Sequence, residues 1–580
     1  MLEEQLFPLL KRKGQLSEEE VEKLSLFEEK LLDAEDAENL DLPIAAILSE
    51  RLFQDAMAKG DLLPKLRRMD QQLSVCYTMM NMTDRLELYP EIAMRYRKEG
   101  FEIGELFIRF LEKKSFAKIE SREAQELILT NARFAAVMYE NMIGDRKSRE
   151  DNLKMLREAL AISEDPFYTE GLKDFDWRYY RYRVLNYFAQ LTDLCNLCGF
   201  EEDLMPEILE RSEEFWEFWH SDPEFFSELE KESFVEFQRL RNRYYAKKIS
   251  NDTYLDGLLT LYHDREMGQY DVSGIIENIQ IPTEILGLVK KDRYTEKEKA
   301  LITTLYNNVI AYAFHIPNSG VLSFMLEQST YFMRHFIELP GELGFEEMML
   351  DFLAAMHPPT YVHSRMVARF SVCLCDHLID MEPELLIGVE GCKTREEVLL
   401  NRNQILEYTW HAALCHDTGK IFIIDTVFVY GRKLLDMEFD LIKTHPKMGA
   451  DMLKRFSSTK KYADVALGHH KWYDNTRGYP EDFDTSKSPV KTVIDLVLCA
   501  DCLDAATDTV GRSYNRGKTF DDYYTELKEG SGTRYAPWLV TLFSRPGVRE
   551  DIDFLLTEGR DQNYHDTYLL LKSVQEKEKS

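Results

Sequence analysis

Apolar residues recur every three or four positions over most of the first 340 residues, in segments dominated by strong helix formers. Alternation with a period of two, which would indicate strands, is scarce. The chain therefore predicts nearly continuous helix here. The expected breaks carry glycine or proline, at Gly60, Pro64, Gly100, Gly144, Pro166, Gly199, Pro223, Pro282 and Pro317.

One stretch of this region resembles a tetratricopeptide unit. Ala136-Val-Met-Tyr139 precedes Gly144, Leu156-Arg-Glu-Ala-Leu160 and a closing Pro166. Further candidates contain Tyr187 and Tyr245, but these tyrosines are spaced too widely and unevenly for the regular repeat. We therefore predict a divergent helical-repeat region over residues 1–340. By analogy with other repeat proteins, such a region would regulate the chain or bind a protein partner on its concave face.

Aromatic side chains are dense in the same region and leave two interpretations open. They could bind a peptide or a nucleotide, but packing of helix against helix is the favoured interpretation. The residues concerned are Trp177, Tyr179, Tyr180, Tyr182, Phe215, Trp216, Phe218 and Trp219.

A second region begins where the chain turns at Leu339-Pro-Gly-Glu-Leu-Gly344. Residues 341–575 again show helical periodicity, but here histidine becomes dense: eight of the 13 histidines lie between His357 and His470. The sequence therefore predicts an all-α fold with two parts, residues 1–340 and residues 341–575.

Composition and charge narrow the functional classes. The chain has 580 residues, 44% of them hydrophobic and 30% charged, as expected of a globular protein with several domains. A net charge of −31 disfavours binding to DNA or RNA. Neither a secretory signal nor a membrane span is evident. Nine scattered cysteines indicate reduced thiols, so we expect a cytoplasmic protein; Cys195 and Cys198 are interpreted as buried structural thiols.

The candidate chemistry lies in histidines and aspartates within or beside apolar segments. Imidazole and carboxylate groups together suit a transition metal, and the number of candidates is too large for one ion. Two ions held about 3.5–4 Å apart are typical of phosphodiester hydrolysis. The candidate ligands are His363, His416, Asp417, His445, His469, His470 and Asp501, with Lys420 nearby.

Helical periodicity places these candidates mostly at helix ends. A ligand pair at a helix end can direct both side chains into one cleft. The expected helices span 362–379, opened by His363; 405–415, ended by His416 and Asp417; 447–456, preceded by His445; 462–468, closed by His469 and His470; and 493–506, which contains Asp501.

The motifs that carry these residues, in this order, resemble one known family. They are His416-Asp-Thr-Gly-Lys420, His445-Pro446 with Gly449-Ala450, His469-His470 followed by Gly478-Tyr-Pro480, and Ala500-Asp501 followed by Asp504-Ala-Ala-Thr507. Residues from about 357 to 530 are similar to HD-GYP domains, a branch of the HD superfamily of metal-dependent phosphohydrolases. This branch hydrolyses cyclic dinucleotides, chiefly cyclic di-GMP.

The resemblance implies a role for each matching position. One metal would be held by His363, His416, Asp417 and Asp501, and the other by Asp417, His445, His469 and His470. A hydroxide between the two ions would attack the phosphorus, with Lys420 facing the scissile phosphate. The ions in this family are usually iron or manganese. Further substrate contacts would come from Arg512, with Arg516 and Lys518 as additional candidates and Tyr479 shaping the loop.

Some positions depart from the family pattern. Pro359 stands where members with a third metal carry glutamate, so two metals are expected. Lys471 replaces the usual glutamate, and the following loop to Gly478 is one residue longer than usual. The link from Thr507 to Arg512 is longer by two. These changes bear on the identity of the substrate more than on the hydrolytic chemistry.

The leading hypothesis is therefore a cyclic di-GMP phosphodiesterase that produces linear pGpG and, in a further step, GMP. One alternative keeps the fold but acts on another cyclic dinucleotide or nucleotide phosphoester. Another is a signalling scaffold that binds a nucleotide without turnover. A protein partner on the N-terminal region and a homodimer are left open by the sequence, whereas neither DNA nor a membrane is expected as a partner.

Overall fold

The computed structural model describes residues 6–32, 42–83, 90–140, 146–194, 203–264, 274–315, 322–424, 436–508 and 517–577. Helices dominate these residues, and the only extended pairings among them are isolated bridges, so the predicted all-α fold class is confirmed. The chain divides into two compact units, Met1–Val289 with Asn318–Gln328, and Lys290–Pro317 with Ser329–Ser580. The functional division predicted at residues 340 and 341 stays a prediction.

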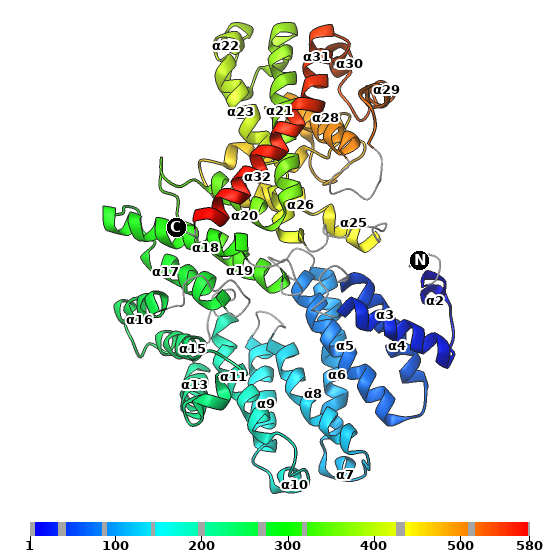
Figure 1. The fold of residues 1–580 in the computed structure, drawn as a ribbon, viewed down its shortest axis with the longest axis vertical. Coiled ribbons are helices and arrows are strands. Elements are labelled where there is room, and N and C mark those ends of the chain that lie inside the picture. Colours follow the sequence, from blue (N-terminus) through cyan, green and yellow to red (C-terminus); the bar gives the residue numbers. More distant parts are fainter. Residues whose placement is uncertain are drawn as a thin grey trace. The chain divides into compact units, whose positions relative to one another are not determined.

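The first unit is an array of helices in which neighbours along the chain pack against one another (Figure 1, blue to green). This arrangement is compatible with a helical-repeat region, but the tetratricopeptide assignment stays a prediction. The helices are α2 (Phe7–Lys11), α3 (Glu18–Leu32), α4 (Leu42–Ala58), α5 (Leu62–Thr83), α6 (Pro90–Phe110), α7 (Lys113–Phe116), α8 (Arg122–Glu140), α9 (Arg146–Ile162), α10 (Pro166–Thr169), α11 (Trp177–Gln190), η2 (Leu191–Leu194), α13 (Met205–His220), α14 (Pro223–Phe226), α15 (Glu232–Tyr245), α16 (Asn251–Asp264), η4 (Ile276–Gln280) and α17 (Ile281–Val289).

The aromatic side chains of this unit mostly form its core. Tyr180, Tyr182, Phe215 and Trp219 are buried in one cluster, with Trp177, Tyr179, Trp216 and Phe218 partly buried against it. The favoured interpretation of these residues as packing groups therefore agrees with their burial.

The expected break at Gly100 is wrong, because α6 runs through this residue and Gly100 is buried. Gly144, Gly199, Pro317, Cys195 and Cys198 lie outside the described residues.

The second unit contains the histidine-rich region. Its helices are α18 (Glu296–His315), the last part of α19 (Leu322–His335), α20 (Phe345–Met356), α21 (Pro358–Met381), α22 (Arg395–Leu400), α23 (Arg402–Leu414), α25 (Asp436–Ile442), α26 (His445–Leu453), α27 (Ala463–Gly468), α28 (Lys491–Thr507), α29 (Phe520–Glu529), α30 (Pro537–Phe543), α31 (Pro546–Phe554) and α32 (Arg560–Lys577), with shorter turns η5 (Pro383–Leu386), η6 (Val389–Gly391), η7 (Thr418–Ile423), η8 (Lys460–Tyr462), η9 (Thr485–Lys487) and η10 (Leu555–Gly559).

Helix α21 is the centre of this unit and packs against α20, α23, α28 and α32 (Figure 1). Its apolar residues Met366, Val367, Phe370, Leu374 and Leu378 recur at helical spacing and are fully buried. The helix begins at Pro358, four residues earlier than the periodicity predicted. Proline is favourable at the first helical position, and the preceding His357 side chain accepts a hydrogen bond from the Thr360 amide.

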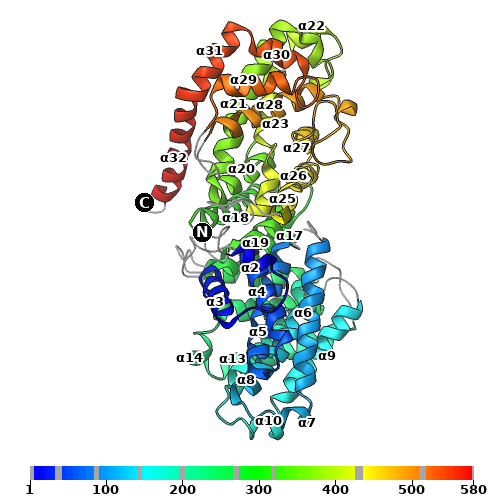
Figure 2. The same cartoon turned by 90° about the vertical axis from the view of Figure 1, so that its right-hand side faces the viewer.

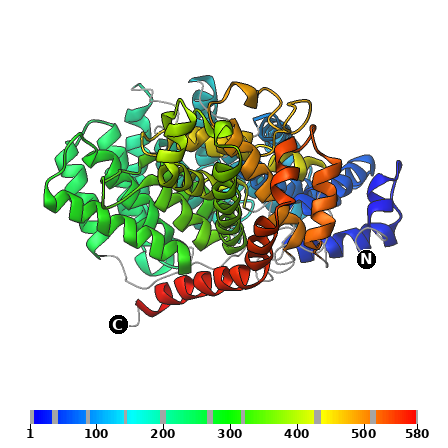
Figure 3. The same ribbon diagram turned by 90° about the horizontal axis from the view of Figure 1, so that it is seen from above.

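The last helices return to α21 from the end of the chain. Helix α31 leads through η10 into α32, which packs along α21 and also contacts α18 and α20 (Figures 2 and 3, red). Across the described ranges, no helix combines the length and apolar character needed to cross a bilayer.

Candidate metal centre

Three of the candidate histidines sit next to helix ends, and this position fixes their rings. His416 follows α23, His445 follows α25, and His469 follows α27. Each Nδ1 lies within hydrogen-bond distance of the carbonyl three residues earlier, in a turn where helical carbonyls lack partners of their own. These carbonyls belong to Ala413 (2.6 Å), Ile442 (2.6 Å) and Ala466 (2.7 Å). Since a carbonyl only accepts, Nδ1 carries the proton and each neutral ring presents the lone pair of Nε2.

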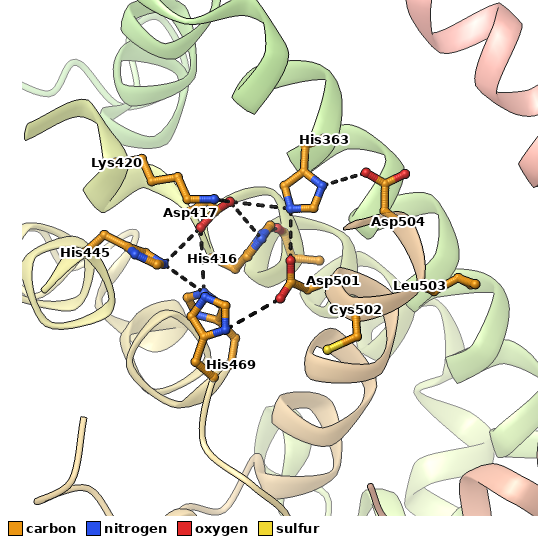
Figure 4. A network of polar contacts seen from close by, with 12 residues as sticks. His363, His416, Asp417, Lys420, His445, His469, Asp501, Cys502, Leu503 and Asp504 are labelled. Atoms are coloured by element: carbon orange, nitrogen blue, oxygen red, sulfur yellow. Dashed lines mark hydrogen bonds and ion pairs between the residues drawn. The ribbon is translucent and has the colours of Figure 1, made fainter. Parts of the chain in front are cut away.

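Asp417 lies at the centre of these rings and is fully buried (Figure 4). Its Oδ1 atom is 3.1 Å from His445 Nε2 and 3.7 Å from His469 Nε2. Its Oδ2 atom is 3.4 Å from His416 Nε2 and 3.5 Å from His363 Nε2. The two oxygens of one carboxylate therefore face two different pairs of histidines.

Lys420 reaches the same carboxylate from the next turn. Its Nζ atom donates to Asp417 Oδ2. Burial alone would raise the pKa of Asp417, but the positive charge of Lys420 holds that pKa well below its usual range. Asp417 is therefore ionised, which is the form that binds a cation.

Asp501 and Asp504 of α28 complete the surroundings of His363. His363 Nε2 lies 3.0 Å from Asp501 Oδ1, and Asp501 Oδ2 lies 3.7 Å from His470 Nδ1. Burial opposes the ionisation of Asp501, but the hydrogen bond with His363 lowers the pKa of Asp501 well below its usual range. The side of His363 away from this group is held by Asp504, whose Oδ2 is 2.6 Å from His363 Nδ1.

His470 lies at the edge of the site and is only partly buried. Its ring centroid is 4.5 Å from that of Tyr479, with 36° between the ring planes. Burial lowers the pKa of His470, as it does for His445 and His469, so the neutral ligating form is favoured. Tyr479 therefore borders the site by packing on a candidate ligand.

The donor set forms two groups that could hold metal ions. Their members are Asp417, His445, His469 and His470 in one, and His363, His416 and Asp501 in the other. Two observations indicate that the groups suit cations. His416 Nε2 is buried and makes no hydrogen bond within the described part of the chain. His445 Nε2 and His469 Nε2 lie only 3.2 Å apart, with lone pairs on both. A divalent cation satisfies both arrangements.

The glycine of the His-Asp-Thr-Gly-Lys motif is explained by close packing. A Cβ atom at Gly419 would lie 1.9 Å from the His445 carbonyl oxygen and 2.7 Å from the Gly449 amide nitrogen. Without side chains at these positions, η7 and α26 approach closely, and α26 begins with His445. The two glycines therefore let Asp417 and His445 share one site.

The structure describes only some of the residues that are predicted to contact the substrate. Lys518 is half-exposed and pairs with Glu526 at 2.5 Å, which leaves its ammonium group already partnered. Arg512 and Arg516 lie outside the described residues.

Two further groups of metal-ligating side chains among the described residues are more exposed. They are Cys373, His377 and Asp551, and His220, Glu232 and Glu236. In the first, His377 Nε2 already pairs with Asp551 at 2.7 Å.

The sequence motifs do not predict that a residue near the end of the chain, Arg560, helps to position His363. Arg560, the first residue of α32, donates to Asp504 Oδ1 at 2.8 Å. The position of Asp504, one turn after Asp501, suggests that it orients a neighbouring group of the site, and in the structure this group is His363. No local motif marks Arg560, because the contact joins segments 56 residues apart.

Comparisons with known proteins agree with the motifs. Residues 360–506 match the family model described as HD domain. A cyclic di-GMP phosphodiesterase of Thermotoga maritima is 33% identical over 179 residues, which are 30% of this chain and 46% of the relative. A cyclic di-GMP phosphodiesterase of Vibrio cholerae is 32% identical over 145 residues, which are 24% of this chain and 28% of the relative.

A third relative carries a different substrate in its name. The 3′3′-cGAMP-specific phosphodiesterase 2 of Vibrio cholerae is 28% identical over 134 residues, 23% of this chain and 25% of the relative. The chain thus spans less than half the length of each of these three relatives. The matches confirm the resemblance of the C-terminal region to this kind of domain.

Proposed function

We propose that this chain, whose residues 360–506 match the HD domain model and carry motifs similar to those of HD-GYP domains, is a metal-dependent phosphodiesterase acting on cyclic di-GMP. The observation that carries the proposal is the placement of Asp417, whose two oxygens face two separate pairs of histidines. A carboxylate placed in this way would suit a pair of metal ions.

We assign one ion to His363, His416, Asp417 and Asp501, and the other to Asp417, His445, His469 and His470. Both would be divalent iron or manganese, as the resemblance to HD-GYP domains implies, and histidine and carboxylate ligands are compatible with either metal. When bound, such ions lower the pKa of water and neutralise charge on a phosphate.

The residues of the chain supply the remaining steps. Asp417 keeps its negative charge and orients the donor set, while the Nδ1 bonds of the histidines hold their lone pairs toward it. Lys420 Nζ, beside Asp417 Oδ2, would place a positive charge against the scissile phosphate and stabilise the charge that develops there. Tyr479 would border the bound nucleotide from its position on His470.

Two comparisons support cyclic di-GMP as the substrate, since the relatives from Thermotoga maritima and Vibrio cholerae carry that activity in their names. The product would be linear pGpG, with GMP after a second cut. We place this reaction in the cytoplasm and assign the N-terminal helices to its regulation through a protein partner.

A second candidate substrate, another cyclic dinucleotide such as cGAMP, is favoured by a specific observation. The loop after His470 differs from the family pattern at Lys471, whose buried Nζ donates to the Glu481 carbonyl at 3.0 Å. A relative specific for 3′3′-cGAMP also matches this region. The altered loop lies beside Tyr479, where a base of the substrate would be accommodated.

The test is turnover by the full chain loaded anaerobically with Fe²⁺ or Mn²⁺. Cyclic di-GMP, cyclic di-AMP and 3′3′-cGAMP are offered separately, with the double variant H416A/D417A as control. Formation of pGpG by the wild type alone supports the proposal. Faster cleavage of 3′3′-cGAMP favours the second candidate, and binding of a nucleotide without cleavage indicates a signalling scaffold.

A further inference from the structure

Arg560 connects the end of the chain to the candidate metal centre. Its Nη2 atom donates to Asp504 Oδ1 at 2.8 Å and to Thr507 Oγ1 at 2.9 Å. Asp504 is fully buried, and the Arg560 side chain is only 12% exposed. The other oxygen of Asp504 accepts from His363 Nδ1 at 2.6 Å. Arg560, Asp504 and His363 therefore form one continuous chain of charge-assisted hydrogen bonds.

The orientation of the His363 ring depends on a contact that is distant in the sequence, unlike the orientations of the other three buried histidines. The rings of His416, His445 and His469 are oriented by carbonyls three residues away in their own backbone. The Nδ1 partner of His363 is instead a carboxylate 141 residues away in the sequence. The direction of His363 Nε2, toward Asp501 and Asp417, is thus set by a tertiary contact.

Further contacts fix the start of α32 against the segment that carries His363. Asn563 is fully buried and donates from Nδ2 to the Val362 carbonyl at 2.9 Å. Tyr564 donates to Asp508 at 2.7 Å, and Arg369 donates to the Gly559 carbonyl at 2.9 Å. These bonds hold the start of α32 against α21, which carries His363, and beside the end of α28, which carries Asp504.

We infer that Arg560 is a positioning residue for the His363 group, and that helix α32, which lies outside the matched HD segment, is needed to complete that group. The inference rests on the metal site of the proposed function. Without Arg560, Asp504 loses the charge-assisted hydrogen bond that holds its Oδ1 atom, and the buried carboxylate is no longer fixed in the orientation that meets His363. His363 then loses the hydrogen bond that directs its Nε2 atom toward the metal position.

The experiment is a Mn²⁺ titration of the metal-free full chain, carried out on the wild type and the variants R560Q, D504N and D566N. Asp566 is the matched control, because its Oδ2 atom lies 3.3 Å from both Arg365 Nη2 and Arg369 Nη2. Asp566 links α32 to α21 by ion pairs, much as Arg560 links α32 to α28. The ion pairs of Asp566 do not involve Asp504. The unfolding temperature of each metal-free variant is measured beside the titration.

The expected result is that the variants weaken the binding of only one of the two Mn²⁺ ions, the ion at His363, His416 and Asp501. R560Q and D504N bind this ion roughly 10- to 100-fold more weakly than the wild type does. The ion at His445, His469 and His470 keeps its wild-type affinity. D566N binds both ions as the wild type does. Wild-type affinity for both ions in R560Q and D504N overturns the inference. So does equal weakening in D566N, because that result indicates only a general loss of helix packing.

The readout separates this inference from the proposed function. It uses no substrate, so a chain that binds two Mn²⁺ ions selectively but cleaves no cyclic dinucleotide refutes the proposed activity and leaves the role of Arg560 standing. A wild-type chain that binds no Mn²⁺ overturns both.

Discussion

His445 Nε2 lies 3.2 Å from His469 Nε2, although each ring already uses its Nδ1 atom to bond a backbone carbonyl. Two lone pairs facing one another in a buried site are unfavourable unless a cation lies between them. Binding of metal should therefore stabilise the folded chain, by about 4 kcal/mol when the free metal is at about 1,000 times its Kd. The unfolding temperature with and without Mn²⁺ measures this effect.

The matching variant is H469A. It removes one of the facing nitrogens, so we expect the rise in unfolding temperature on adding Mn²⁺ to become smaller than in the wild type. H565A is the control, since His565 is exposed on α32 and belongs to neither of the two groups at the candidate metal centre. An equal rise in H469A and the wild type would show that the ion binds elsewhere.

Lys420 should contribute more to turnover than to metal binding, because bound cations would themselves keep Asp417 ionised. Replacement by alanine removes the positive charge beside Asp417, and we expect kcat for cyclic di-GMP to fall by roughly 10²- to 10³-fold, as for loss of one group that stabilises a transition state. Kinetics of K420A, together with its metal content, test this. K443A is the control, because Lys443 pairs with Asp440. Loss of metal from K420A would assign Lys420 to the assembly of the site instead.

Gly419→Ala should damage the fold around the site. The added Cβ atom would lie 1.9 Å from a backbone oxygen of His445, which no side-chain rotation relieves. We expect a loss of about 3 kcal/mol or more in the free energy of unfolding, measured by denaturant titration. At Gly60 a Cβ atom would meet no atom within 4 Å, so G60A should be close to neutral. A stable G419A with normal metal content would contradict the close approach of η7 and α26.

Asp351 should make stability depend on pH. Burial raises the pKa of Asp351 to about 6, although its hydrogen bond from Tyr306 opposes the rise. A carboxyl whose pKa is raised by folding stabilises the protein while it is protonated. That contribution, up to about 3 kcal/mol, is complete below about pH 4 and disappears as the pH passes about 6. The difference in unfolding free energy between wild type and D351N should therefore change between pH 4 and pH 7. A constant difference would refute this account.

The sequence predicted the parts of the site that depend on local chain geometry. His416 and Asp417 are adjacent and follow a helix, so their motif already implies that both side chains enter one cleft. The helical periodicity likewise located α23, α27 and α28 to within a few residues. Apolar spacing alone predicts that α21 starts at Val362, because it does not reveal Pro358 at the first helical position or the His357 cap before it.

What the sequence could not supply depends on tertiary contacts. The pairing of Asp417 Oδ1 and Oδ2 with different histidines requires coordinates, since spacing gives no distances between elements. Arg560 lies on a helix with no recognisable motif, and its partner Asp504 is 56 residues earlier. The expected break at Gly100 failed because a buried glycine within a helix is tolerated where neighbouring helices pack closely.

The central claim is that two metal ions at Asp417 enable the hydrolysis of a cyclic dinucleotide. The most direct measurement is elemental analysis of the Mn²⁺-loaded full chain, combined with product analysis after incubation of the same sample with cyclic di-GMP. We expect about two ions per chain and formation of pGpG, with both lost in D417A. Fewer than two ions, or two ions without cleavage of any cyclic dinucleotide, would contradict the claim.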